Sequence, residues 1–454
     1  MDDDRLSVPV LVVVLMAVLA AASCNARSKD ESKAGGKTEV TLATVANPQM
    51  EDMAKLAKVF EKDNPTITVN FVVLPENQLR DRITQDVATK GGQFDIVTVG
   101  TYEVPIWAKN GWIEPLSDRI AATSGYDGDD IIPAVREALS YEGKVHAVPF
   151  YAESSFLMYR KDLFDAAGLT MPDHPTWDQV ADFAAKLHHP DQKQYGICLR
   201  GLPGWGEVFA PLNTVVNTFG GRWYDEQWNA KLTEQPFVDA VTFYVNLVRN
   251  SGQPGAAKSG FTECLTATAQ GNAAMWYDAT VAASLLEDPK SSKVAGKMAY
   301  VPAPVKETKA AGWLWAWSLA IPKTSRKQDA AWKFVAWATS KEYMKLVGQT
   351  LGWTRVPPGS RVSTYSIPEY KEAAKAFASI TLQALEEIDP KNPGTQPRPY
   401  AGIQYVGIPE FQALGTSVSQ EIAAAIAGSE TPDEALAKGQ VMAEEVASKG
   451  GYKK

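Results

Sequence analysis

Residues 39–100 switch repeatedly between strand and helix periodicity, and no other feature of the chain restricts its fold as strongly. Three segments predict strands: EVTLATV (39–45), ITVNFVVL (67–74) and FDIVTVG (94–100). Between the first two, apolar residues recur at helical spacing until Asn64-Pro65, and residues 77–90 predict a second helix. A β-α-β-α-β order predicts a parallel sheet with helices on its faces.

The loops after the first and third strands are candidate binding elements, because ligands of such sheets bind outside the carboxyl ends of the strands. These loops are Ala46-Asn47-Pro48 and Gly100-Thr101-Tyr102-Glu103. We therefore expect Asn47, Tyr102 and Glu103 at the binding edge. The alternatives are that Asn47 is a turn residue or helix cap and that Glu103 is a solvated loop carboxylate.

The rest of the chain continues the α/β pattern, and 454 residues are enough for two domains with their own cores. Extended segments surround Pro149 within residues 144–160, and two further strands are predicted at 296–305 and 312–322. Helical stretches are predicted at 176–187 and 235–249, and a helical block at 329–347. The fold class is therefore α/β.

The N-terminus is typical of an exported lipoprotein. The apolar run from Val8 to Ser23 is too short to span a bilayer and ends in small residues, as a signal peptide does. Cys24 follows at once, and a polar stretch comes after it. We expect a signal peptide at 1–23, a lipid on Cys24 and a flexible tether over 24–38. The acidic MDDDR start departs from the usual pattern and leaves plain export or an intracellular location as alternatives.

Charge and histidine content exclude several functions. The net charge is −8 and no basic block is longer than two residues, so a nucleic-acid-binding function is not expected. The four histidines show no metal-ligand spacing, and we expect neither a metal nor a cofactor. Cys198 and Cys264 could pair in an exported chain or remain buried thiols, and the sequence leaves this open.

Several segments resemble one family closely, and the likeness runs from about residue 39 to the end. These segments are FDIVTVGTYEVPIWAKNGW, VPFYAESSFLMYRKDLF, YGICLRGLPGWGE, NTFGGRW, MWYDATVAA, WLWAWSLAIP and YVGIPEF. They resemble the solute-binding proteins of ABC importers, in the sugar-binding group, and within it the sorbitol- and mannitol-type polyol-binding lipoproteins.

The resemblance implies a two-lobed periplasmic-binding-protein-like fold with mainly parallel sheets and hinge crossovers. The N-terminal lobe would be 39–149 plus 282–342, and the C-terminal lobe 150–281 plus 343–454. A polyol or small sugar would bind in the cleft of a monomer held at the outer face of the cytoplasmic membrane by its lipid. The partner would be an ABC permease with its ATPase subunits, and the protein itself would not be an enzyme.

A polyol site needs groups that accept and donate hydrogen bonds, and aromatic rings to cover CH faces. Tyr151 and Glu153 stand at the first crossover, where the alternative is a structural ion pair. In CLRGLPGWGE (198–207) we expect Arg200 as a donor and Trp205 as a stacking platform, unless the stretch is a plain loop with a salt bridge. The resemblance and the C-terminal loops add further candidates: Trp276, Asp278, Trp353, Tyr400, Gln404 and Tyr405.

Three tryptophans alternate in GWLWAWSLAIP (312–322), so a strand would carry them on one face. A strand buried on both faces is usual in α/β lobes. We therefore expect Trp313 and Trp317 in the core, and the resemblance places Trp315 in the cleft.

Two other classes of protein stay possible from the residues alone. Glu103 and Glu153 could act as acid and base of an exported carbohydrate-active enzyme, although no enzyme motif is present. A scaffold lipoprotein would bind no small molecule.

Overall fold

The computed structural model describes residues 36–453. The expected signal peptide (1–23), Cys24 and residues 25–35 of the expected tether lie outside the described residues. The strand predicted from residue 39 is β1 (Thr38–Val45), which takes up the last residue assigned to the tether.

The first sheet has five strands in the order β2-β1-β3-β10-β6. β2 (Ile67–Leu74) and β3 (Ile96–Val99) both run parallel to β1. β10 (Trp315–Ala320) is antiparallel to β3 and to β6 (Val148–Glu153). The predicted opening β-α-β-α-β unit is confirmed, because α1 (Pro48–Asp63) and α2 (Glu76–Thr89) connect its parallel strands.

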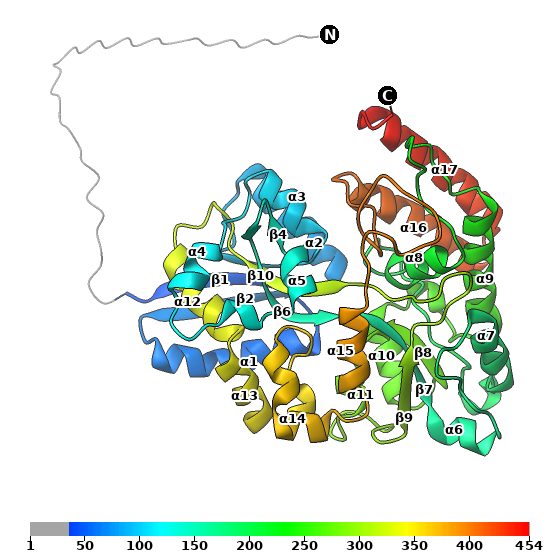
Figure 1. The fold of residues 1–454 in the computed structure, drawn as a ribbon, viewed down its shortest axis with the longest axis horizontal. Coiled ribbons are helices and arrows are strands. Elements are labelled where there is room, and N and C mark those ends of the chain that lie inside the picture. The colour runs from blue at the N-terminus through cyan, green and yellow to red at the C-terminus, as the bar shows by residue number, and fades with distance from the viewer. Residues whose placement is uncertain (1–35, 454) are drawn as a thin grey trace, which may run out of the picture. The chain divides into compact units, whose positions relative to one another are not determined.

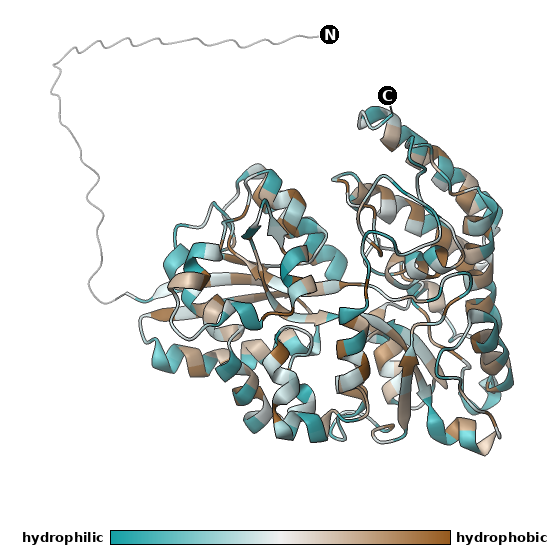
Figure 2. Cartoon of the chain, in the orientation of Figure 1, coloured by the Kyte–Doolittle hydropathy of each residue, from teal (hydrophilic) through white to brown (hydrophobic). Residues whose placement is uncertain are grey.

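Helices cover both faces of this sheet, with α2 and α3 (Glu103–Lys109) on one side and α1 and α13 (Lys341–Thr350) on the other (Figure 1). α1 buries Met50, Met53, Leu56 and Phe60, which lie on one face at helical spacing. The apolar strands lie between the more polar helices in Figure 2.

The other elements packed around the first sheet are α3 (Glu103–Lys109), α4 (Ser117–Ala122), α5 (Pro133–Ala138), β4 (Ser140–Tyr141), β5 (Lys144–Val145), α12 (Gln328–Ala338) and α13 (Lys341–Thr350). The helical block predicted over 329–347 consists of two helices, because the chain breaks between α12 and α13. Ser340 caps α13, and its hydroxyl accepts a hydrogen bond from the Tyr343 amide at 3.0 Å.

The second sheet has three strands in the order β8-β7-β9. β7 (Ser155–Arg160) lies in the middle and is antiparallel to β8 (Met275–Ala279) and β9 (Met298–Pro302). The expectation of a mainly parallel sheet in both lobes is therefore wrong for these strands. β7 follows β6 in the chain after Ser154, and both strands that pair with β7 are antiparallel to it.

The helices of this half of the molecule are α6 (Lys161–Ala166), α7 (Trp177–Lys186), α8 (Phe209–Thr218), α9 (Gln235–Ser251), α10 (Phe261–Ala269), α11 (Ala282–Leu286), α15 (Ala378–Glu386), α16 (Phe411–Ala427) and α17 (Pro432–Lys449). We call the first sheet with its packed elements the N-terminal lobe, and the second sheet with its packed elements the C-terminal lobe.

The chain passes between the two sheets at Ser154, between β6 and β7, and again over residues 303–314, between β9 and β10. Strand pairing thus places 150–153 with the N-terminal lobe and β9 with the C-terminal lobe, opposite to the ranges expected from the resemblance. The exact lobe boundaries stay a prediction.

Residues 343–361 also differ from the expected division, because they pack on the N-terminal lobe. The Tyr343 ring lies 5.6 Å from the ring of Phe150. The buried Arg361 guanidinium donates to the carbonyl oxygens of Thr339 and Tyr126 at 2.8 and 2.9 Å. α14 (Pro368–Ala373) follows this segment.

Cys198 and Cys264 form a disulfide, which settles the pairing that the sequence left open. The bond joins the loop that precedes Arg200 to α10, and the two Cα atoms are 5.6 Å apart. In the part of the chain that the structure describes, no helix has the length and apolar character needed to cross a membrane.

Candidate functional site

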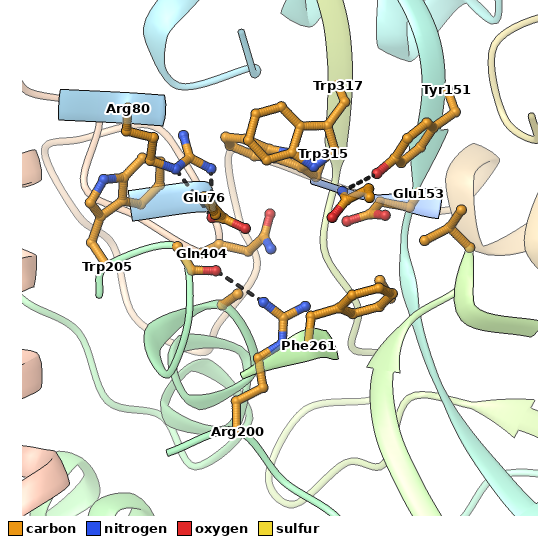
Figure 3. Close-up of a pocket in the computed structure, with 15 residues that line it drawn as sticks. Glu76, Arg80, Tyr151, Glu153, Arg200, Trp205, Phe261, Trp315, Trp317 and Gln404 are labelled. Atoms are coloured by element: carbon orange, nitrogen blue, oxygen red, sulfur yellow. Dashed lines mark hydrogen bonds and ion pairs between the residues drawn. The ribbon is translucent and has the colours of Figure 1, made fainter. Parts of the chain in front are cut away.

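A cavity with an empty volume of about 440 Å³ lies between the two lobes (Figure 3). Both lobes supply its walls. Its lining residues are Asn47, Glu76, Arg80, Tyr151, Glu153, Arg200, Trp205, Gly206, Ala210, Phe261, Ala279, Val281, Trp315, Trp317 and Gln404.

The N-terminal lobe meets the cavity with the carboxyl ends of its strands. Asn47 follows β1 and Glu76 follows β2, as expected for a parallel sheet. β6 places Tyr151 and Glu153 at the same edge. The Asn47 side-chain amide donates a hydrogen bond of 2.7 Å to the Tyr151 hydroxyl, and burial raises the pKa of that hydroxyl well above its usual value.

Arg80 stands one helical turn after Glu76 on α2 and is buried at the cavity wall. Its Nη2 donates to Glu76 Oε1 at 2.9 Å, and its Nη1 forms an ion pair with Glu103. Burial alone would lower the pKa of Arg80, but Glu103 and Glu76 raise it. The guanidinium is therefore a fixed cation.

Three indoles surround this cation. The Arg80 Cζ lies 4.2 Å from the ring centroid of Trp205 and 4.8 Å from those of Trp315 and Trp317. β10 runs antiparallel to β3, which brings its first residues to the carboxyl edge of the sheet. Gly100 makes room there, since a Cβ at this position would overlap the Trp315 ring.

The C-terminal lobe contributes Arg200, which Asp278 holds in a bidentate ion pair. Arg200 Nε and Nη2 donate to the two Asp278 oxygens at 2.8 and 2.5 Å. Nη1 donates to the Gly206 carbonyl at 3.1 Å, and the guanidinium lies 5.2 Å above the Phe261 ring. Each of these contacts fixes the direction in which Arg200 faces the cavity.

Glu153 and Gln404 supply the acceptors that protein groups leave free. Both side chains are more than nine-tenths buried and line the cavity. Within residues 36–453, the Glu153 carboxylate forms no ion pair and the neutral Trp313 indole N–H faces it, while Gln404 Oε1 lacks a hydrogen-bond partner. Burial raises the pKa of Glu153 well above its usual value, although Arg200 opposes the shift.

The structure brings seven of the predicted ligand-binding residues to the cavity: Asn47, Tyr151, Glu153, Arg200, Trp205, Trp315 and Gln404. Five others lie behind this wall. Glu103 pairs with Arg80 and Asp278 pairs with Arg200, while Trp276 donates to Asp278 at 3.0 Å. Tyr102 and Tyr405 pack beside Trp205, with ring centroids 4.6 and 6.1 Å from it.

Trp353 and Tyr400 do not reach the cavity, so the structure does not support contact with a ligand there. Trp353 belongs to a short 3-10 helix and packs over Gly348. The Tyr400 hydroxyl accepts a hydrogen bond from the Trp223 amide at 2.9 Å, and its ring packs near Trp228.

Sequence reasoning missed Glu76, Arg80, Phe261 and Trp317 in the cavity wall. Trp317 was expected in the core, but it shares a strand face with Trp315, and the alternation itself was the signal. Glu76 and Arg80 look in sequence like an ordinary surface pair at i and i+4. Phe261 carried no local signal.

Among the described residues, no group of three or more His, Cys, Asp or Glu side chains could hold a metal ion. Two α/β lobes that enclose a polar and aromatic cavity form the periplasmic-binding-protein fold.

Residues 47–345 match the bacterial extracellular solute-binding protein family, and the chain belongs to this family. It is 48% identical to the mannitol-binding protein of Pseudomonas aeruginosa over 422 residues. The aligned region covers 93% of this chain and 96% of that protein. The predicted family is thereby confirmed.

Solved structures agree with this assignment. An ABC transporter solute-binding protein from Agrobacterium vitis, with bound D-mannitol, is 49% identical and has a TM-score of 0.90 over 91% of this chain and 99% of its own. One from Agrobacterium radiobacter, in complex with ribitol, is 28% identical with a TM-score of 0.81, over 90% of this chain and 99% of its own. The predicted α/β two-lobed fold is confirmed.

Proposed function

We propose that this protein captures a linear polyol in the cavity between its lobes and delivers it to the permease of an ABC importer. One observation carries the proposal: a chain 49% identical, with a TM-score of 0.90, holds D-mannitol. The alternative with the same role is capture of a cyclic sugar or oligosaccharide.

The cavity chemistry supports a neutral, hydroxyl-rich ligand. Every hydroxyl group of a polyol donates one hydrogen bond and can accept others. Glu153 and Gln404 are free to accept, while the indole faces of Trp315 and Trp317 cover CH groups. A cavity that hydrogen-bonds hydroxyls discriminates strongly against analogues that lack them, because its polar groups would stay unpaired.

The proposed mechanism is capture without chemistry. A polyol contacts Asn47, Tyr151 and Glu153 of one lobe together with Arg200 and Trp205 of the other. Because these contacts form together only in the closed form, the ligand shifts the population toward closure. Glu103 and Asp278 act as positioning residues that hold Arg80 and Arg200. The closed monomer then docks on the permease, whose ATPase subunits supply the energy.

Export and lipid anchoring belong to the same proposal. Cleavage before Cys24 and lipidation of its thiol would hold the protein at the outer face of the cytoplasmic membrane. Cells that produce the wild type should retain it in the membrane fraction, whereas Cys24→Ala should release it. Equal release of both proteins would contradict the anchor and leave export alone.

The proposed ligand class is tested by calorimetry and thermal unfolding of the chain that starts at Asn25. The panel contains four- to six-carbon polyols, pentoses, hexoses and disaccharides. A ligand at a thousandfold excess over Kd raises the free energy of unfolding by about 4 kcal/mol. Stabilisation by polyols alone supports the proposal, and stabilisation by cyclic sugars alone supports the alternative.

Two buried arginines provide a matched control for the location of the site. Arg200→Lys keeps the charge but loses the bidentate geometry, so polyol affinity should fall roughly 10- to 100-fold. Arg361→Lys alters an arginine that is bound to backbone carbonyls within the N-terminal lobe and should leave the affinity unchanged. Equal effects of the two substitutions would place the ligand elsewhere.

A further inference from the structure

The cavity wall and the groups that contact its cations together contain more carboxyl groups than guanidinium groups. Arg80 and Arg200 are its two cations. The carboxyl groups in the wall or in direct contact with these cations are Glu76, Glu103, Glu153, Glu207 and Asp278. Four of them are more than nine-tenths buried. Glu76, Glu103 and Asp278 form ion pairs with the two guanidinium groups and already outnumber them. Burial raises the pKa of Glu153 well above its usual value and that of Glu207 to about 8, so these two groups add negative charge only when they lose their protons.

The protein already uses most of the donors of the two arginines. Arg80 donates to Glu76 and Glu103, and Arg200 donates to Asp278 and the Gly206 carbonyl. The acceptors of Glu153 and Gln404 stay free, as described above. The cavity thus offers acceptors in excess, and this excess favours a ligand that brings additional donors.

We propose that the cavity also binds linear amino polyols, in which a primary ammonium replaces one terminal hydroxyl, and that it rejects the corresponding polyol carboxylates. This inference rests on the proposed function, because it assumes that a polyol chain occupies the cavity.

An ammonium group matches this wall in two respects. It carries three donors and no acceptor, whereas a hydroxyl brings one donor. It also offsets the excess negative charge, which is weakly screened because the surrounding groups are buried. A ligand carboxylate would place hydrogen-bond acceptors opposite the acceptors of the wall and would add a further negative charge.

Glu153 is the expected partner of the ammonium, because its carboxyl group is buried at the cavity wall and forms no ion pair with any residue from 36 to 453, where the neutral Trp313 indole N–H faces it. Burial raises its pKa, Asp278 and Glu76 add to that effect, and Arg200 and the Trp313 indole N–H oppose it. Arg80 and Tyr151 also line the space in front of it. An ammonium beside Glu153 would favour the ionised form, so a protonated Glu153 should release its proton when the amine binds.

The test compares three ligands with one carbon skeleton: D-mannitol, 1-amino-1-deoxy-D-mannitol and D-mannonate. Titration calorimetry at about pH 7 keeps the primary amine protonated, since such amines titrate near pH 10. We expect the amine to bind within about tenfold of D-mannitol, or more tightly, and D-mannonate to bind at least about 100-fold more weakly. Repeating the titrations in buffers of different ionisation enthalpy should detect proton release with the amine but not with D-mannitol.

Two variants separate the role of Glu153 from a general charge effect. Glu153→Gln should lower the ratio of amine affinity to mannitol affinity at least about tenfold and abolish the proton release. Asp95→Asn is the matched control, because Asp95 is also a buried carboxylate but pairs with Ser325 and Lys327 outside the cavity. That variant should leave the ratio unchanged.

The outcomes distinguish this inference from the proposed function. If D-mannitol binds but the amine binds no better than D-mannonate, the inference is wrong and the proposed function stands. If the amine binds and no neutral polyol does, the inference holds for the site and the proposed ligand class is wrong. If no member of the series binds, both are overturned.

Discussion

Reduction of the Cys198–Cys264 disulfide should destabilise the protein and leave its ligand affinity almost unchanged. The bond joins residues that are 66 positions apart. In the chain-entropy account, a cross-link stabilises mainly by restricting the unfolded chain. For a loop of this length, the loss should be about 4 kcal/mol of unfolding free energy.

The folded site does not depend on the bond for its geometry. The Cys198 amide donates to the Met275 carbonyl at 2.8 Å. The Tyr244 hydroxyl donates to the Arg200 carbonyl at 2.7 Å. The Asp278 ion pair fixes the Arg200 side chain independently of both contacts. We therefore expect the affinity for D-mannitol to change by less than about threefold, under 1 kcal/mol.

Urea unfolding with and without a phosphine reductant measures the stability, and titration calorimetry measures the affinity. A Cys198→Ala, Cys264→Ala double variant is the control, because the reductant should not alter its stability. A stability loss below about 1 kcal/mol, together with a tenfold loss of affinity, would refute the reasoning. That pattern would mean that the bond acts in the folded state.

Three further perturbations follow from contacts around the cavity. Gly206→Ala should weaken D-mannitol binding more than about 100-fold in calorimetry, because the added Cβ would overlap Glu76 Oε1 of the other lobe. An unchanged affinity would show that binding does not require the close contact between Gly206 and Glu76. Tyr102→Phe removes the 2.9 Å hydrogen bond to the Ile408 carbonyl and should weaken binding roughly 2- to 12-fold, about 0.5–1.5 kcal/mol, whereas an unchanged Kd would argue against its role in closure. The raised pKa of Glu153 means that its stabilising contribution is present below its unfolded value of 4.5 and is lost as pH rises through the folded pKa. Urea unfolding of the ligand-free protein should show this decline, and a Glu153→Gln variant with the same pH profile would contradict it.

The binding edge of the N-terminal lobe could be predicted because it follows from strand direction. Parallel strands end at one edge, so the loop containing Asn47 was identifiable from the alternation of periodicities alone. The direction in which a side chain leaves that edge was not identifiable. Glu103 follows β3 and Glu153 is the last residue of β6, yet Glu103 contacts Arg80 and Glu153 lines the cavity.

The C-terminal lobe was less predictable because its strands pair over long sequence distances. β7 lies between β8 and β9, which come more than 100 residues later in the chain. The local periodicity of a segment does not indicate which distant strand it pairs with. The position of the Arg80 side chain was also not predictable from local sequence. Its spacing from Glu76 is that of a solvated helix face, and only the folded chain shows the indoles that cover it.

The contact between Arg80 and the indoles has an optical consequence. Trp205 comes from one lobe, while Trp315 and Trp317 come from the other, and the Trp205 and Trp315 ring centroids are 5.9 Å apart. Indole emission responds to a nearby positive charge and to access of water. Separation of the lobes removes Trp205 from the guanidinium and exposes all three rings at once. The unlabelled protein therefore contains its own fluorescent reporter of domain motion.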